Sequence, residues 1–171
     1  TNGSQNAFTT GEQTAFFFEL PSSHNSDEIS FDHLLGIFSS FFAEPLFHPS
    51  SINKEIYAIE SEHNANVSST SKILYHATRL LANRSHPFHR FATGNLLTLK
   101  NLPQAQPLNV RNMLQEYFNA YYISTKMTLC IRGPQSINTL AKLAVTEFGN
   151  LPRQRSLKRS LLGTVRSPMK C

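Results

Sequence analysis

The sequence contains no tryptophan and only two cysteines, Cys130 and Cys171. Two widely separated cysteines do not make the disulfide framework of a small secreted domain. No apolar run approaches the roughly 18 residues that a transmembrane helix needs. Cys130 lies in the apolar run MTLCIRG and is therefore expected to be a buried thiol. These shortages favour a chain without a transmembrane segment, in a reducing intracellular compartment.

Several common catalytic signatures are also missing. The sequence has no glycine-rich phosphate loop, no G-x-S-x-G and no cysteine quartet. Seven histidines and many serines make any Ser/His/Asp assignment arbitrary. In contrast, 13 phenylalanines and a hydrophobic content of 40% are enough for the core of one compact domain of 171 residues.

The positive charge is concentrated at the end of the chain. The net charge is +5, but residues 153–171 hold six lysines and arginines and no acidic residue. Such a tail could bind nucleic acid or anionic lipid. Its Ser, Arg and Pro content without periodicity is more typical of a linker, and no nucleic-acid partner is expected. We therefore predict one domain over 1–151 and a basic linker over 152–171 that leads to a further domain.

The hydrophobic pattern predicts a layered fold of the α+β class. Period-2 and helical spacings indicate strands at 6–10, 14–20 and 126–133, and helices at 31–42, 49–67, 72–83, 109–122 and 136–149. Residues 84–107 are expected to be mostly loop because three prolines and one glycine interrupt them. The aromatic run at 15–20 is typical of a strand that is buried on both faces. The expected sheet is mixed and largely antiparallel, incomplete at its N-terminal side, and packed by helices.

The stretch KEIYAIESEH, at 54–63, carries two glutamates seven residues apart, Glu55 and Glu62. On an α-helix they share a face and lie about 10.5 Å apart along the axis, so they cannot both bind one zinc ion. One of them could bind a metal while the other holds a neighbouring group. A solvated helix face without any site is the alternative reading.

Histidine spacing offers no complete metal motif. IESEH matches H-x-x-E-H except at its first position, where Ile59 replaces histidine, so this helix cannot be a self-contained zinc site. His86 and His89 have i,i+3 spacing, but Pro87 lies between them, and we interpret them as loop residues rather than ligands.

Four stretches taken in order resemble the insulysin branch of the pitrilysin-type zinc metalloproteases. They are GSQNAFTTGEQTAFFFEL, FFAEPLF, KEIYAIESEHNAN and HPFHRFATGNLLTL, and the resemblance covers residues 3–151. CIRGP and SEHNANVSSTSKILYHATRLLAN look closest to the fungal members that process the a-factor mating pheromone and act in axial bud-site selection.

The resemblance implies a zinc cofactor, Zn²⁺, with Glu62 as one of its ligands. Glu55 matches the acidic residue that supports the site without binding the metal, and His63 is not carried over as a ligand. In the family, two histidine ligands and the glutamate that activates water lie in an H-x-x-E-H motif, which is expected upstream of Thr1. This segment alone is therefore expected to be inactive as a zinc endopeptidase, because zinc catalysis needs three protein ligands.

The resemblance also implies a peptide substrate that adds as a strand beside the NAFTT segment, with Asn6, Ala7 and Phe8 lining the groove. The a-type pheromone precursor is one such substrate, and the remaining domains of the same protein are expected partners. A cytoplasmic location, at the cell cortex or bud neck, follows from the same resemblance. The alternative function is a non-catalytic scaffold or interaction module of the same fold, for example in bud-site selection.

Overall fold

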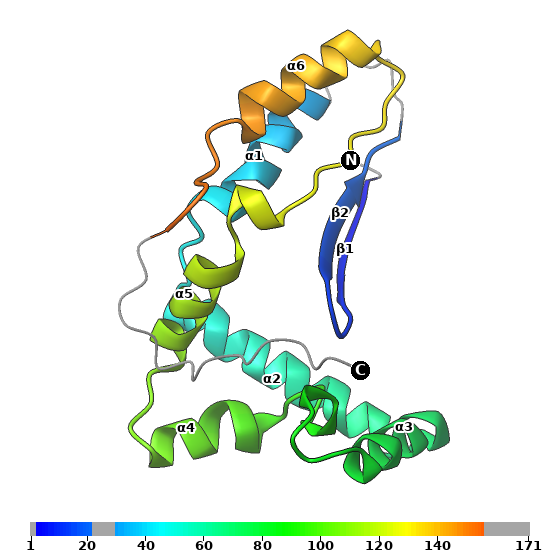
Figure 1. Ribbon diagram of the computed structural model, residues 1–171, viewed down its shortest axis with the longest axis vertical. Coiled ribbons are helices and arrows are strands. Elements are labelled where there is room, and N and C mark those ends of the chain that lie inside the picture. The colour runs from blue at the N-terminus through cyan, green and yellow to red at the C-terminus, as the bar shows by residue number, and fades with distance from the viewer. Residues whose placement is uncertain (1–2, 22–29, 156–171) are drawn as a thin grey trace. The chain divides into compact units, whose positions relative to one another are not determined.

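The computed structural model describes residues 3–21 and 30–155, and its elements confirm the α+β class (Figure 1). A two-stranded antiparallel sheet, β1 (Ser4–Thr9) and β2 (Thr14–Glu19), precedes the helices. The α-helices are α1 (Phe31–Ala43), α2 (Pro49–Asn66), α3 (Thr70–Leu81), α4 (Leu102–Ala105), α5 (Val110–Tyr121) and α6 (Ile137–Phe148). In this part of the chain, no helix is both long and apolar enough to cross a membrane.

The chain divides into two compact units, which are described separately. The described residues of the first unit are 3–21, 30–45 and 119–155, and those of the second unit are 46–118. Most of the predicted basic linker, from residue 156 onward, lies outside the described residues.

In the first unit, the β1–β2 hairpin packs one face against α1. Ser4 lies opposite Glu19 and Thr9 opposite Thr14. Phe16 and Phe18 share a face because strand side chains alternate. The Phe18 ring lies 5.1 Å from that of Phe38 on α1, an aromatic contact that adds to the burial of apolar surface.

The other face of the hairpin carries Phe8 and Phe17, which are 48% and 42% exposed. The prediction of a β2 strand buried on both faces is therefore wrong. A sheet is buried on both faces only where elements cover both. In the first unit, as far as it is described, α1 covers only the face of Phe16 and Phe18, and even there Phe16 is 41% exposed.

Helix α1 supplies the core of this unit. Ser30 caps its N-terminus by accepting a hydrogen bond from the His33 amide at 3.2 Å, as serine commonly does. The buried residues Leu35, Ser39 and Phe42 follow at helical spacing. The helix predicted at 31–42 is therefore present, and its buried residues lie on one face.

Arg155 holds the C-terminal end of α1. Its guanidinium donates to the carbonyl oxygens of Phe42 and Ala43, at 2.7 and 2.9 Å, and to that of Tyr122 at 3.2 Å. A cation is favoured there because the helix dipole is negative at this end. Burial lowers the pKa of Arg155, and the charge of Glu44 partly offsets that effect. Three segments of the first unit therefore meet at one side chain.

In the second unit, α2 and α3 follow each other with a break at 67–69, as predicted. The segment at 84–107 is not mostly loop, because a π-helical stretch, Leu97–Asn101, leads into α4. Pro103 follows directly after this π-helical stretch, so the helical segment continues through the proline. Treating every proline as a helix breaker caused this error.

The strand predicted at 126–133 is not part of a sheet among the described residues, and Cys130 is exposed rather than buried. A strand is stabilised by backbone hydrogen bonds to a neighbouring strand, and an apolar run does not identify that neighbour. Within the described ranges, only β1 and β2 are paired.

Candidate functional site

Helix α2 presents Glu55 and Glu62 to solvent. It begins at Pro49, which suits the first turn of a helix, after the N-cap residue His48. Over its 18 residues, the side chains of Glu55 and Glu62 are both exposed. Their separation of seven residues is nearly two full turns, so both lie on one face of α2.

A neighbouring stripe of α2 packs within the second unit. Ile56 is buried, and Ile59, Glu60 and His63 are half-buried. Glu55 and Glu62 lie beside this stripe, about 100° around the helix from its centre, and both are exposed. A solvent-facing pair of carboxylates remains free to contact a metal ion or another part of a longer protein.

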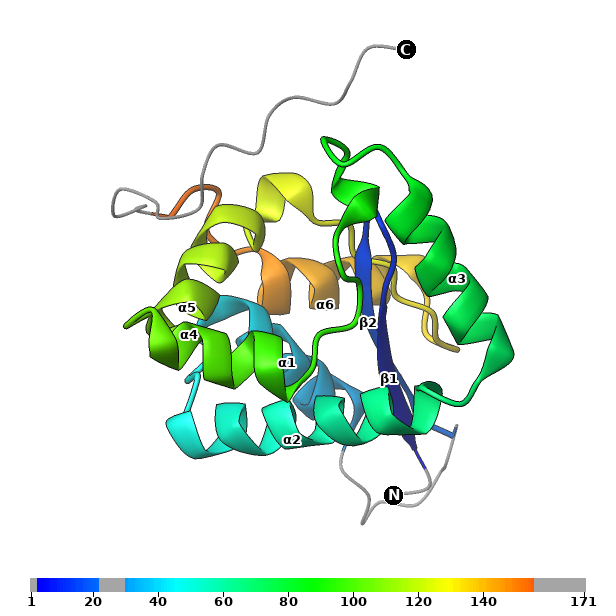
Figure 2. The ribbon, with the colours of Figure 1, turned by 90° about the horizontal axis from the view of Figure 1, so that it is seen from below.

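Three hydrogen bonds fix α2 against the helical segment 96–105, which lies beside it in both views (Figures 1 and 2). The Leu96 amide donates to Oε2 of Glu60 at 2.6 Å. Lys100 Nζ donates to Oδ1 of Asn53 at 3.1 Å and to the hydroxyl of Tyr57 at 2.9 Å. These contacts join residues between 36 and 47 positions apart in sequence.

The HPFHRF segment is held by α2 and α3. The Phe91 ring lies between the rings of His63 and His76, with centroid distances of 5.7 and 5.3 Å and edge-on geometry. His86 Nδ1 accepts a hydrogen bond from the Phe88 amide at 3.1 Å, which starts the 3₁₀ turn Pro87–His89. The interpretation of His86 as a loop residue therefore agrees with its position.

Arg79 completes this attachment. Its Nε and Nη2 both donate to the Arg90 carbonyl oxygen, at 3.0 and 2.9 Å, and its guanidinium lies 4.5 Å from the centre of the Phe88 ring. Sequence reasoning missed both Arg79 and Glu60. The spacing of Tyr75 and Arg79, four residues apart on one helix face, was the available signal for Arg79.

The described residues do not form a zinc site by themselves. Residues 3–21 and 30–155 contain no group of three or more His, Cys, Asp or Glu side chains that could hold a metal ion. A catalytic zinc ion needs three protein ligands and an open position. Glu62 offers one exposed carboxylate, fewer than the three protein ligands that such a site needs.

The predicted substrate strand lies in the first unit. Asn6, Ala7 and Phe8 are all exposed on β1. Asn6 and Phe8 point to one face of the hairpin and Ala7 to the other. Among the described residues, β1 pairs on one side only, with β2. Its second edge therefore carries backbone groups that an added peptide strand could use, and one of them, the Ala7 amide, donates to Oδ1 of Asn6 at 2.8 Å in this structure.

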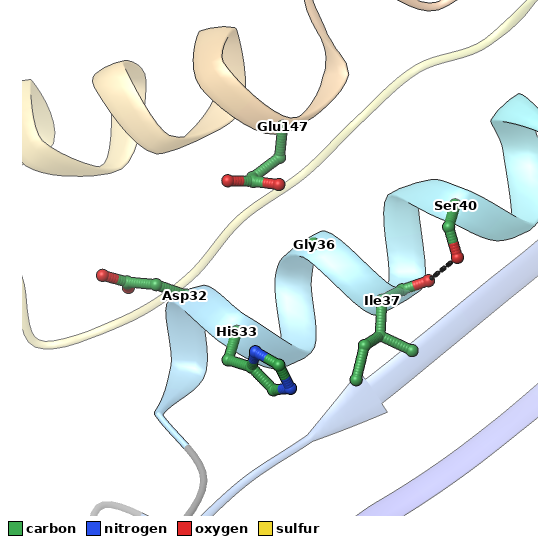
Figure 3. A pocket seen from close by; sticks show the side chains of 6 residues that line it. All are labelled: Asp32, His33, Gly36, Ile37, Ser40 and Glu147. Carbon is green, nitrogen blue, oxygen red and sulfur yellow. Dashed lines mark hydrogen bonds between the residues drawn. The ribbon is translucent and has the colours of Figure 1, made fainter.

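An open pocket occurs in the first unit between α1 and α6 (Figure 3). Its lining residues are Asp32, His33, Gly36, Ile37, Ser40 and Glu147. A Cβ atom on Gly36 would lie 3.0 Å from Oε2 of Glu147, so glycine lets this carboxylate rest against α1. None of the candidate site residues from the sequence lines this pocket.

Comparison with known proteins identifies the family. The model of the insulinase family, peptidase family M16, matches residues 1–90. AXL1 of Saccharomyces cerevisiae is 53% identical over 97% of this chain. The chain belongs to the insulinase family of peptidases. The A-factor-processing enzyme of the same yeast is 38% identical over 81% of the chain.

The structural comparison places the fold in the same insulinase family. The crystal structure of pitrilysin superposes with a TM-score of 0.78, covering 95% of this chain and 16% of pitrilysin, at 25% identity. The chain spans 14% of the length of AXL1 and 13% of that of the A-factor-processing enzyme. It therefore corresponds to a small part of these insulinase-family relatives.

Proposed function

We propose that this chain is part of the catalytic domain of a zinc-dependent endopeptidase, in which Glu62 is one zinc ligand and Glu55 supports it. The observation that carries the proposal is the outward face of α2. Glu55 and Glu62 are exposed there, while the neighbouring stripe of α2 packs within its own unit. Membership of the insulinase family supports reading this face as a site rather than as an ordinary solvated surface.

The other zinc ligands and the group that activates water lie outside the described residues in this proposal. The corresponding organisation is a peptidase domain over 1–151 and a basic linker over 152–171, joined to further domains of the same protein. Because a single carboxylate does not hold zinc for catalysis, the chain alone is inactive.

The proposed substrate is a peptide that adds as a strand to the free edge of β1. Asn6, Ala7 and Phe8 would line the groove. The side-chain NH₂ of Asn6 can donate to a peptide carbonyl, whereas its Oδ1 already accepts from the Ala7 amide at 2.8 Å. Similarity to the A-factor-processing enzyme supports a mating-pheromone precursor as the substrate. A cytoplasmic location, at the cell cortex or bud neck, belongs to the same proposal.

The test is a pair of matched substitutions in the full-length protein. Glu62→Gln should remove both zinc and peptide cleavage while the fold stays intact. Glu55→Gln should lower cleavage by about 10–100-fold and leave most of the zinc bound, since its role is supporting. Zinc is measured by elemental analysis, and cleavage with a fluorogenic peptide.

A control with the same chemical change is Glu12→Gln in the hairpin turn, which should keep its zinc. Normal zinc content and cleavage in Glu62→Gln would refute the assignment of this ligand. A wild-type protein that binds no zinc and cleaves no peptide would instead support the scaffold alternative.

A further inference from the structure

We propose that Glu60 is a positioning residue that sets the orientation of Glu62 by anchoring α2 to the helical segment 96–105. This inference rests on the proposed function, because it concerns how the proposed ligand is aimed. Glu60 itself is half-buried and points to the packed side of α2.

The contact of Glu60 is a charge-assisted cap on another helix. The amides in the first turn of a helix have no partner within the helix. Asn95 Oδ1 accepts from the Thr98 amide at 3.0 Å, and Oε2 of Glu60 accepts from the Leu96 amide at 2.6 Å. A carboxylate is favoured at this end because the helix dipole is positive there. The capping group of the Leu96 amide therefore comes from α2, whereas that of the Thr98 amide comes from the residue just before the capped segment.

Glu60 and Glu62 project from opposite sides of α2. Two residues correspond to about 200° of rotation around a helix of 3.6 residues per turn. Holding Glu60 on one side therefore fixes the direction of Glu62 on the other. Lys100, bound to Asn53 and Tyr57, provides a second attachment about one to two turns earlier along the same helix.

A zinc site requires its ligands to be placed accurately, and this explains why the anchoring of α2 matters. Side chains extend about 5–6 Å from the helix axis, so a rotation of about 20° moves a carboxylate by about 2 Å. Metal–ligand distances tolerate only about ±0.2 Å. A loosely held α2 would therefore weaken zinc binding without unfolding the protein.

The experiment compares three variants in the full-length protein. Glu60→Met removes the acceptor at nearly constant size, and Glu60→Gln restores an oxygen acceptor. Asn95→Ala is the matched control, because it removes the other cap of the same helical segment without touching α2. Zinc affinity is measured by competition with a chromogenic chelator, folding by thermal unfolding, and the local contact by hydrogen exchange of the Leu96 amide.

Glu60→Met should weaken zinc binding about tenfold or more, as losses of residues that orient metal ligands do. Glu60→Gln should recover most of the affinity and the slow exchange of the Leu96 amide, whereas Asn95→Ala should lose thermal stability but keep its zinc affinity.

Equal losses of zinc affinity in Glu60→Met and Asn95→Ala, or unchanged affinity in Glu60→Met, would overturn the positioning role. If Glu60→Met does not fold, the test is the Glu60→Gln variant. Exchange of its Leu96 amide much faster than in the wild type would also overturn the positioning role. Loss of zinc in Glu62→Gln with normal zinc in Glu60→Met refutes only this inference, whereas normal zinc in Glu62→Gln refutes the proposed function itself.

Discussion

The guanidinium of Arg155 donates a hydrogen bond to the carbonyl oxygen of Phe42 at 2.7 Å, across 113 positions of the sequence. The same group also binds the carbonyl oxygens of Ala43 and Tyr122. A carbonyl at the end of a helix has no partner within the helix, so this contact satisfies groups that would otherwise need water. The last described residue of the first unit therefore ties three of its segments together.

Replacing this side chain should destabilise the first unit. Arg155→Met removes the donors of three carbonyl oxygens and should lower the free energy of unfolding by about 1–3 kcal/mol. Arg153→Met, an exposed neighbour, should change it by less than about 0.5 kcal/mol. Urea unfolding followed by circular dichroism measures both values, and equal losses would contradict the role of Arg155.

Two adjacent phenylalanines on α1 should respond very differently to truncation. Phe42 is 8% exposed and packs against Phe16 and Phe38, whereas Phe41 is 57% exposed. Phe42→Ala should cost about 3–5 kcal/mol, because it leaves a cavity among aromatic rings. Phe41→Ala should cost less than about 1 kcal/mol. A comparable loss at Phe41 would mean that the buried face of α1 has been assigned incorrectly.

A lysine at this position should not be able to make the contacts of Arg79. A lysine ammonium lacks the planar fork that lets two nitrogens of Arg79 share the Arg90 carbonyl oxygen while stacking on Phe88. Arg79→Lys should speed amide exchange in the Pro87–His89 turn roughly tenfold, equivalent to about 1.4 kcal/mol. The exposed Arg84→Lys serves as the control and should leave this exchange unchanged, so faster exchange in both variants would count against a specific clamp.

The 171-residue chain by itself should bind zinc weakly or not at all. Its described residues bring no three ligating side chains together, and one carboxylate cannot replace a three-ligand site. Titration with zinc under an indicator dye tests this expectation. Tight binding of one zinc ion per chain would show that the chain carries a site of its own.

Local patterns predicted most helices, because their signal lies within a few turns. The apolar spacing at 31–42 predicted α1. The seven-residue separation of Glu55 and Glu62 predicted that they lie on one face of a helix. Helix periodicity is a property of neighbouring residues, so it can be recognised without knowing the rest of the fold.

Features that depend on distant partners could not be predicted in the same way. The partner of Glu60 is 36 positions away, and nothing near Glu60 indicates Leu96. The exposure of Phe17 and Cys130 depends on which elements cover them, and strand burial is decided by such non-local contacts.

The division of the first unit between two stretches of sequence has a consequence for synthesis on the ribosome. Residues 46–118 are contiguous and can begin to fold as soon as they emerge. Helix α1 emerges earlier, but Tyr122, Phe148 and Arg155, which contact it, are added only after that whole stretch, and translation proceeds at about 5–20 residues per second. The aromatic face of α1 therefore stays uncovered in the nascent chain for seconds, until the residues that pack against it have been synthesised.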